Sequence, residues 1–369
     1  RALSSAASDV YKRQTYKFPA VRGIQANTEY YISMVPMKFL NKLFSDVTDN
    51  NVLPEFRAQR KLNELRIPEI ANYILDNRNS YVFSALSASI DGDFKFIQSN
   101  EFSNVGVLEV DMNATFLIND GQHRKAAIER ALLEDGTLGD ETISIVFFKD
   151  EGLIRSQQMF TDLNKHAVKA SNSMATLYDS RDTLAVATKK IINKIPFFKK
   201  FTDKEKDNLG KNSSNLFTLN NIYKANQKII KGTCSESDEN FLLNYWSLIC
   251  KYIIEWQEVL NRELTKKDLR ENYIITLAIT MLALGRLGAW FYENKDVNME
   301  EYLQKLSRID WLRGNSDWQN RVIKSNGKVQ NNDEAVRLTC SKIKQLIGIE
   351  LSKEEKEKES LLVKSKGNK

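Results

Sequence analysis

The hydrophobic pattern of this chain changes near residue 150. Before that point, short apolar runs are separated by turn-forming residues, which is the pattern of β-strands. After it, apolar residues recur at helical spacing almost to the C-terminus. The pattern therefore predicts an α/β (α+β) fold, in which a small α/β domain precedes a helical domain. The predicted strands are residues 81–88, 94–97, 105–110, 114–118 and 142–148; the predicted helices are 67–77, 153–163, 174–195, 217–230, 239–262, 271–294 and 332–346.

The two ends of the chain differ in composition from the two domains that we predict between them. Residues 1–14, RALSSAASDVYKRQ, resemble translated sequencing-adapter read-through and carry no information about the fold; without Arg1, Lys12, Arg13 and Asp9 the formal charge falls from +6 to +4. We predict a sheet domain over residues 15–150 and a helical domain over 151–351. Residues 352–369 are strongly charged, which predicts a disordered tail.

Composition excludes several classes of protein. No apolar run reaches the about 18 residues that a transmembrane helix needs. The three cysteines are far apart and there are only two histidines, so neither a disulfide framework nor a metal site is expected. A hydrophobic content of 42% is enough for a sizeable core. We expect a globular cytoplasmic protein that makes no contact with membranes.

Five residues, Asp120-Gly121-Gln122-His123-Arg124, join a predicted strand to a predicted helix. If Asp120 or Gly121 caps the helix, the free N–H groups of its first turn favour an anion there. Helical spacing places His123 and Arg124 at the end of the buried stripe formed by Ala127, Ile128, Ala131 and Leu132, with Lys125 and Glu129 in solvent. We therefore predict that a phosphate binds at the start of this helix, close to Arg124. The alternative is a capped helix in which Arg124 pairs with a carboxylate and His123 is a half-buried, hydrogen-bonded side chain.

The motif resembles the DGQHR-domain family, and in particular the DndB proteins of bacterial DNA phosphorothioation systems. Further matches are residues 54–60 (PEFRAQR), 67–74, 157–167 (QQMFTDLNKHA), Asp317-Trp318 and 327–329. That family is similar to ParB and sulfiredoxin, whose corresponding segment binds nucleotide phosphates. The resemblance implies a small ParB/sulfiredoxin-like mixed-sheet domain followed by a helical domain, and a protein that acts as a negative transcriptional regulator at the promoter of the modification genes. The phosphate-binding residues it implies are Arg57, Asp120, Gly121, Gln122, His123, Arg124 and Asn164.

A basic stretch suggests a DNA-binding surface, because lysines interleaved with Phe197, Phe198 and Phe201 can hold a phosphate backbone. The alternative is a solvated lysine face over an aromatic core. In the helix at 217–230, Asn220, Asn221, Lys224 and Gln227 have the spacing to reach base edges. The candidate DNA-binding lysines are Lys189, Lys190, Lys194, Lys199, Lys200, Lys204, Lys224 and Lys228.

Two other classes of function remain open. In one, Asp120 and His123 are the catalytic pair of a nucleotide hydrolase or DNA-processing enzyme, although no Walker A sequence and no neighbouring nucleophile are present. In the other, the protein is a scaffold with a vestigial site. The expected partners are promoter DNA and other proteins of the phosphorothioation system, and the one cofactor considered is a nucleoside triphosphate.

Overall fold

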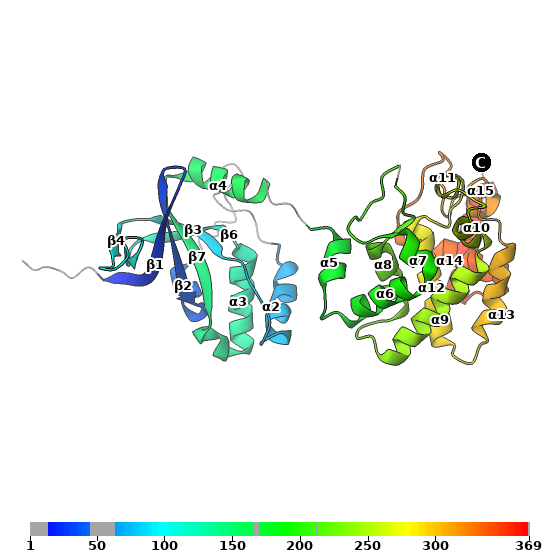
Figure 1. The fold of residues 1–369 in the computed structure, drawn as a ribbon, viewed down its shortest axis with the longest axis horizontal. Coiled ribbons are helices and arrows are strands. Elements are labelled where there is room, and N and C mark those ends of the chain that lie inside the picture. The colour runs from blue at the N-terminus through cyan, green and yellow to red at the C-terminus, as the bar shows by residue number, and fades with distance from the viewer. Residues whose placement is uncertain (1–13, 45–62, 166–169, 212, 368–369) are drawn as a thin grey trace, which may run out of the picture. The chain divides into compact units, whose positions relative to one another are not determined.

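The computed structural model describes residues 14–44, 63–165, 170–211 and 213–367. The chain divides into two compact units, Arg1–Val168 and Lys169–Lys369, each with its own hydrophobic core (Figure 1). The division lies after α4 (Leu153–Lys165) and not at residue 150 as predicted. A contact between Met159 of α4 and Asn119 of the sheet explains part of this difference, because it attaches the helix to the first unit.

The first unit is built on a seven-stranded mixed sheet, which confirms the predicted fold class. The strand order is β4-β5-β1-β2-β7-β3-β6. All neighbouring pairs are antiparallel except β3 with β7, which is parallel. The strands are β1 (Thr15–Gln25), β2 (Thr28–Pro36), β3 (Leu86–Asp91), β4 (Phe94–Gln98), β5 (Val105–Asp111), β6 (Thr115–Asp120) and β7 (Thr142–Lys149).

Two turns differ from the sequence prediction. The hairpin of β1 and β2 was not predicted; its turn residues, Ala26 and Asn27, both have positive φ, at 51° and 61°, as a type I′ turn requires. Conversely, Asp91-Gly92-Asp93 between two predicted strands is a sequence signal for a hairpin, and the hairpin that it predicts is wrong. The chain does turn at Gly92, where φ is 139°, but β3 pairs with β6 and β7 while β4 pairs with β5.

Helices α2 (Arg66–Asp76) and α3 (Gln122–Glu134) pack against each other and contribute to the core of this unit. Ala127, Ile128 and Ala131 are fully buried, as the stripe predicted. Lys125, however, is buried and not in solvent; its ammonium group lies 2.9 Å from the carboxylate of Glu129 one turn later, and that pairing compensates for burial. The described part of this unit also contains three short helical segments: η1 (Met37–Phe39), α1 (Leu40–Leu43) and η3 (Gly136–Asp140).

The second unit is helical apart from two short parallel strands, β8 (Thr202–Asp203) and β9 (Phe217–Thr218). Trp246, Trp256, Trp311 and Trp318 are fully buried in its core. The helices are α5 (Asn172–Tyr178), α6 (Thr183–Lys194), α7 (Pro196–Phe201), α8 (Leu219–Ile229), α9 (Glu236–Tyr252), α10 (Ile254–Asn261), α11 (Lys266–Asn272), α12 (Ala278–Glu293), α13 (Met299–Leu303), η4 (Gln304–Arg308), η5 (Ser316–Trp318), α14 (Asp333–Ile347) and α15 (Lys353–Gly367).

Some predicted helices are divided in the structure. The predicted helix at 174–195 is split into α5 and α6 because Asp182 caps α6, accepting hydrogen bonds from the N–H groups of Leu184 and Ala185. The predicted helix at 239–262 is split into α9 and α10 at Ile253, whose backbone is extended. Across the described residues, no helix has both the length and the apolar character needed to cross a membrane.

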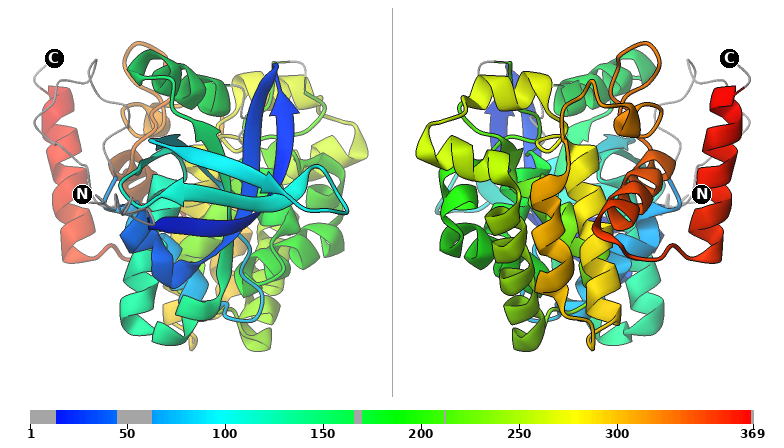
Figure 2. Two further views of the ribbon diagram at one scale, coloured as in Figure 1. Left: turned by 90° about the vertical axis from the view of Figure 1, so that its left-hand side faces the viewer. Right: turned by 90° about the vertical axis from the view of Figure 1, so that its right-hand side faces the viewer.

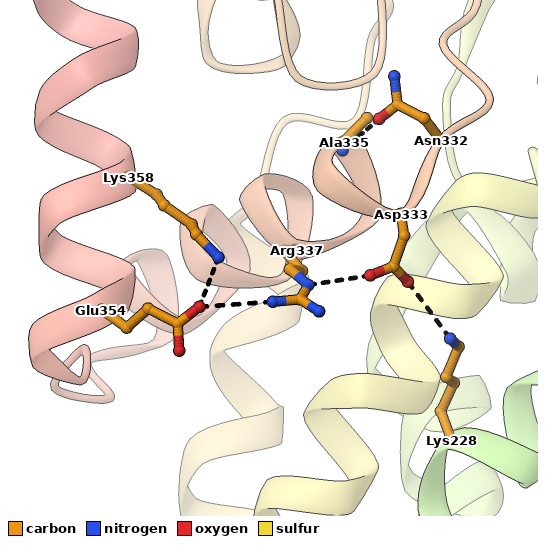
Figure 3. A network of polar contacts seen from close by, with 7 residues as sticks. All are labelled: Lys228, Asn332, Asp333, Ala335, Arg337, Glu354 and Lys358. Carbon is orange, nitrogen blue, oxygen red and sulfur yellow. Dashed lines mark hydrogen bonds and ion pairs between the residues drawn. The ribbon is translucent and has the colours of Figure 1, made fainter.

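The prediction that the charged C-terminal segment is disordered is wrong for its described residues, because Lys353–Gly367 form α15, which contacts α14 (Figure 2). Glu359 on this helix is 7% exposed and makes an ion pair with Arg321, which is 5% exposed. Exposed charges add a surface network in which Glu354 of α15 contacts Arg337 of α14 (Figure 3). Composition alone missed the helix since its attachment depends on a partner far away in the sequence.

Candidate functional site

The turn between β6 and α3 depends on a glycine. Gly121 is the N-cap of α3 and has a φ of 101°, which L-residues with side chains rarely adopt. A Cβ at this position would lie 2.4 Å from Cδ2 of Leu86 and 3.3 Å from the guanidinium carbon of Arg124. Gly121 therefore lets strand, turn and helix approach closely, and Asp120 is the last strand residue and not the cap.

Arg124 crosses the turn to the start of β3. Its Nη1 donates to the carbonyl oxygens of Ser84 at 2.7 Å and Ala85 at 2.8 Å, and also contacts the hydroxyl of Ser84. Its Nη2 lies 2.5 Å from Oδ2 of Asp120. Among the described residues, no acceptor takes the Nε hydrogen or the second Nη2 hydrogen. The contact with Asp120 is the ion pair that the sequence left as an alternative to phosphate binding.

His123 is half-buried and accepts a hydrogen bond. The backbone N–H of Asn63 lies 2.9 Å from Nε2 of His123, so this nitrogen is unprotonated in that contact. Asn63 lies just before α2, and the contact ties the start of α3 to the segment that leads into α2. This geometry gives His123 a structural role.

The N-terminus of α3 has no side-chain cap among the described residues. Asp120 pairs with Arg124, and Gly121 has no side chain to offer. The first N–H groups of this 13-residue helix and the positive end of its dipole therefore remain favourable for an anion. Gln122, at the first helical position, is half-buried and lies beside these groups.

Polar side chains lie behind the motif within the sheet, and the sequence reasoning missed them. Asn119 is 1% exposed and donates from Nδ2 to the hydroxyl of Ser89 at 2.8 Å. Two side-chain oxygens, Oδ1 of Asn119 and the hydroxyl of Ser87, are buried with no hydrogen-bond partner among the described residues. Ser87 lies opposite Asp120 in the register of β3 and β6. Alternating serines in an otherwise apolar strand were the available signal.

Two predicted ligands cannot be located relative to the motif. Arg57 lies outside the described residues, and so does the side chain of Asn164 near the end of α4. The described site therefore consists of the residues from Asp120 to Arg124 and their contacts.

Most candidate DNA-binding lysines are bound within the protein. Lys189 donates to the carbonyl oxygens of Leu177 and Asp179 at 2.9 and 2.6 Å, and Lys204 donates to Oδ1 of Asn193 at 2.9 Å. The other internally paired lysines are Lys190 and Lys194, which contact Glu239 at 2.7 and 3.6 Å, and Lys228, which contacts Asp333 at 3.3 Å (Figure 3).

Three candidates, Lys199, Lys200 and Lys224, are exposed and form no ion pair with the described part of the chain. The aromatic residues between the lysines are not available to bases, because Phe197, Phe198 and Phe201 are at most 4% exposed. The alternative of an aromatic core beneath a lysine face thus describes this segment.

The proposed base-reading helix, α8, is also partly committed to the core. Asn220 is 8% exposed, so its predicted contact with a base edge is wrong. Asn221 contacts the hydroxyl of Thr218, the N-cap of α8. One face of α8 is buried because it packs against α12. The two helices approach closely at Gly285 of α12, where an added Cβ would lie 2.5 Å from the carbonyl oxygen of Ala225 in α8. Lys224 and Gln227 remain exposed.

Fold and motif together define an α+β protein whose mixed sheet leads into an uncapped helix N-terminus suited to anions. A family model described as DndB, DNA-sulfur modification-associated, matches residues 18–350. The chain therefore belongs to the DndB family, and this membership supports a role in a DNA sulfur modification system. No curated protein and no solved structure matches the chain.

Proposed function

We propose that this protein is a DNA-associated regulator that represses transcription of the DNA phosphorothioation genes, and that its DGQHR motif binds a phosphate or nucleotide. The observation that carries the phosphate site is the uncapped N-terminus of α3, held in place by the contacts of Arg124. The regulatory role rests on membership of the DndB family.

In this proposal the backbone N–H groups of the first turn of α3 are the main phosphate ligands. They are preorganised, since Gly121 shapes the turn and Arg124 fixes it to β3. Arg124 is a positioning residue whose unused Nε and Nη2 hydrogens are available to a ligand. Gln122 supplies an amide at the edge of the site, and a phosphate here gains both hydrogen bonds and the helix dipole.

A charge substitution tests the phosphate site. Gln122→Glu keeps the shape of the side chain and suits a helix N-terminus, but its negative charge repels a phosphate. Leu133→Glu is the matched control, because Leu133 is 88% exposed at the other end of the same helix. Calorimetric titration with a nucleoside triphosphate should show binding to wild type and to Leu133→Glu, and loss of about tenfold or more in affinity for Gln122→Glu. Equal affinities would refute the site.

The regulatory role has its own test. A reporter gene fused to the promoter of the modification genes should be repressed several-fold when this protein is supplied, and derepressed when it is absent. Unchanged expression in both conditions would refute the role in transcription whatever the phosphate site binds.

The hydrolase alternative has less support in the geometry. Asp120 is paired with Arg124, and Nε2 of His123 already accepts the Asn63 N–H. His123→Gln keeps a hydrogen-bonding side chain, so we expect it to change the affinity for a nucleotide and not any rate of nucleotide hydrolysis. Steady nucleotide hydrolysis by wild type that disappears in His123→Gln would instead establish catalysis.

A further inference from the structure

A polar cavity lies entirely within the helical unit, apart from the DGQHR motif of the first unit. Its volume is about 220 Å³, and it is lined by Arg270 of α11, Arg313, and residues at the starts of α8 and α12. This volume is below the roughly 300 Å³ at which pockets for drug-sized ligands begin. The cavity therefore suits a small group.

The two arginines carry charge that no carboxylate neutralises directly. Neither forms an ion pair with any of the residues that the structure describes. Arg270 uses its Nη1 and Nη2 to hold the loop before β9, donating to carbonyl oxygens that include Gly210 at 2.9 Å and Lys211 at 3.1 Å. Its charge thus stays at the cavity wall while its hydrogen bonds support the wall itself.

Arg313 has donors left for a ligand. Its Nε donates to the carbonyl oxygen of Tyr273 at 3.2 Å, and its Nη2 to that of Arg270 at 2.6 Å. Nη1 donates to no acceptor within the described ranges. Burial lowers the pKa of Arg313, against a smaller opposing effect of Glu271, so the lost hydration of the guanidinium is only partly compensated.

The start of α12 adds to the positive potential. Thr276, Leu277 and Ala278 line the cavity, and Leu277, the N-cap of this 16-residue helix, has an apolar side chain that cannot cap it. Of the N–H groups at this helix end, those of Leu277 and Thr280 already donate to backbone carbonyl oxygens at 3.0 Å, which leaves those of Ala278 and Ile279 for a ligand within the described structure.

One acidic residue, Asp207, also lines the cavity, but its carboxylate is occupied. It accepts hydrogen bonds from the backbone N–H groups of Asn172 and Ser173 at 2.9 and 2.8 Å and from the Asn172 side chain at 2.7 Å. Burial raises its pKa, but these hydrogen bonds outweigh burial and lower the pKa overall. Two arginines and a helix N-terminus against one engaged carboxylate leave the cavity positive.

We infer that this cavity is a second oxyanion site, which binds a phosphate group through Nη1 of Arg313 and the first turn of α12. The phosphate belongs either to a small metabolite, such as inorganic phosphate or a mononucleotide, or to a nucleic-acid backbone. The site lies in a different unit from the DGQHR motif and does not depend on the function proposed for it.

The decisive variant is Ala278→Asp. Ala278 is exposed at the first position of α12, where an acidic side chain favours the helix but repels an anion in the cavity. Asn298→Asp is the matched control; it makes the same charge change at the N-cap of α13, which does not line the cavity. Arg313→Gln removes the donor directly, although it also removes hydrogen bonds to Tyr273 and Arg270.

Calorimetric and thermal-shift titrations of the full chain use sodium phosphate, with sodium chloride at equal ionic strength as reference. We expect phosphate to raise the Tm of wild type and Asn298→Asp with increasing concentration, and Ala278→Asp to lose about tenfold or more in phosphate affinity. Phosphate bound at α3 is unaffected by Ala278→Asp, so failure at one site does not imply failure at the other.

Competition then identifies the source of the phosphate. Displacement of phosphate by deoxyadenosine monophosphate but not by a short duplex assigns the site to small metabolites, and displacement by the duplex assigns it to a nucleic-acid backbone. The inference is wrong if phosphate stabilises wild type no more than chloride does, or if wild type and a folded Ala278→Asp variant bind phosphate equally.

Discussion

Arg124 and Asp120 are joined by an ion pair across the glycine that separates strand from helix, with Nη2 of Arg124 2.5 Å from Oδ2 of Asp120. The same guanidinium holds the carbonyl oxygens of Ser84 and Ala85 at the start of β3. A residue expected to be a ligand therefore fixes the turn on which the proposed phosphate site depends.

Replacing Arg124 should destabilise the first unit. Arg124→Ala leaves the carbonyl oxygens of Ser84 and Ala85 without their donor, and we expect a loss on the order of 1–3 kcal/mol in the free energy of unfolding. Arg124→Lys should recover only part of this loss, because one ammonium group cannot reproduce the planar fork. Urea denaturation measures the effect. An Arg124→Ala variant as stable as wild type would show that these hydrogen bonds are dispensable.

The glycine at the turn should resist substitution more than another glycine of similar φ. Gly121→Ala adds a Cβ that would lie 2.4 Å from Leu86, in addition to the strain of a φ of 101°. Gly152 has a φ of 94° and no atom within 4 Å of its added Cβ, so Gly152→Ala measures the strain alone. We expect a cost of about 1–3 kcal/mol from strain in both variants and a larger total for Gly121→Ala. Equal denaturation midpoints would disprove the close approach.

The buried pair of Arg321 and Glu359 should hold α15 in place. Glu359→Ala leaves the Arg321 charge buried and unpaired, with an expected loss of about 3–5 kcal/mol. Lys358→Ala is the control, because it breaks only the exposed ion pair with Glu354 (Figure 3) and should change stability little. Hydrogen exchange of α15 should accelerate in Glu359→Ala alone. Protection that persists in this variant would mean that other interactions attach the helix.

Buried thiols should reduce stability in alkaline solution. Burial is the main cause that raises the pKa of Cys340 from 9.0 to about 12 and that of the half-buried Cys234 to about 11. The unfolded chain loses these protons first, so the free energy of unfolding should fall as the pH rises above about 9. Urea unfolding at pH 8 and pH 10 should show a smaller decrease for Cys340→Ala than for wild type. Identical decreases would assign the effect to other groups.

The sequence predicted the strands of the first unit, the helical second unit and the strand–turn–helix motif because these features depend on local hydrophobic period and on glycine, whereas the mixed sheet was implied by the family resemblance. The hairpin of β1 and β2 was missed since its turn, Ala26-Asn27, lacks the glycine that usually marks positive φ. The hairpin at Gly92 was wrong because a turn does not determine which strands pair. Partners distant in sequence decided only the second case.

The same limit applies to the candidate sites. Spacing indicated that Arg124 faces inward. It could not show that the carbonyl oxygens of Ser84 and Ala85 accept the hydrogen bonds of Arg124. The lysines of α6 read as a free basic surface until the structure showed Glu239 of α9 beside Lys190 and Lys194. The cavity at Arg313 left no local motif, because its residues come from separate helices and loops.

The exposed lysines predict which part of the helical unit contacts the DNA backbone. Among the candidate lysines, Lys199, Lys200 and Lys224 have ammonium groups that form neither an ion pair nor a hydrogen bond within the described structure, so they should supply the cations that neutralise the phosphate backbone. Lys199→Glu with Lys200→Glu should weaken binding to any duplex and flatten its dependence on salt by about 0.9 log–log units for each phosphate that is no longer neutralised. Lys190→Glu with Lys194→Glu, which disrupts pairs with Glu239, is the control for charge and should affect stability more than the salt slope.

The central claim is that this protein binds the DNA it regulates. Fluorescence anisotropy of a labelled duplex from upstream of the modification genes, titrated with wild-type protein over a salt series, tests it most directly. We predict an affinity for the upstream duplex at least about 10³-fold higher than for a shuffled duplex at physiological salt, with binding to both weakened by salt. No binding to either duplex at low salt, or equal affinity for the two, would contradict the account.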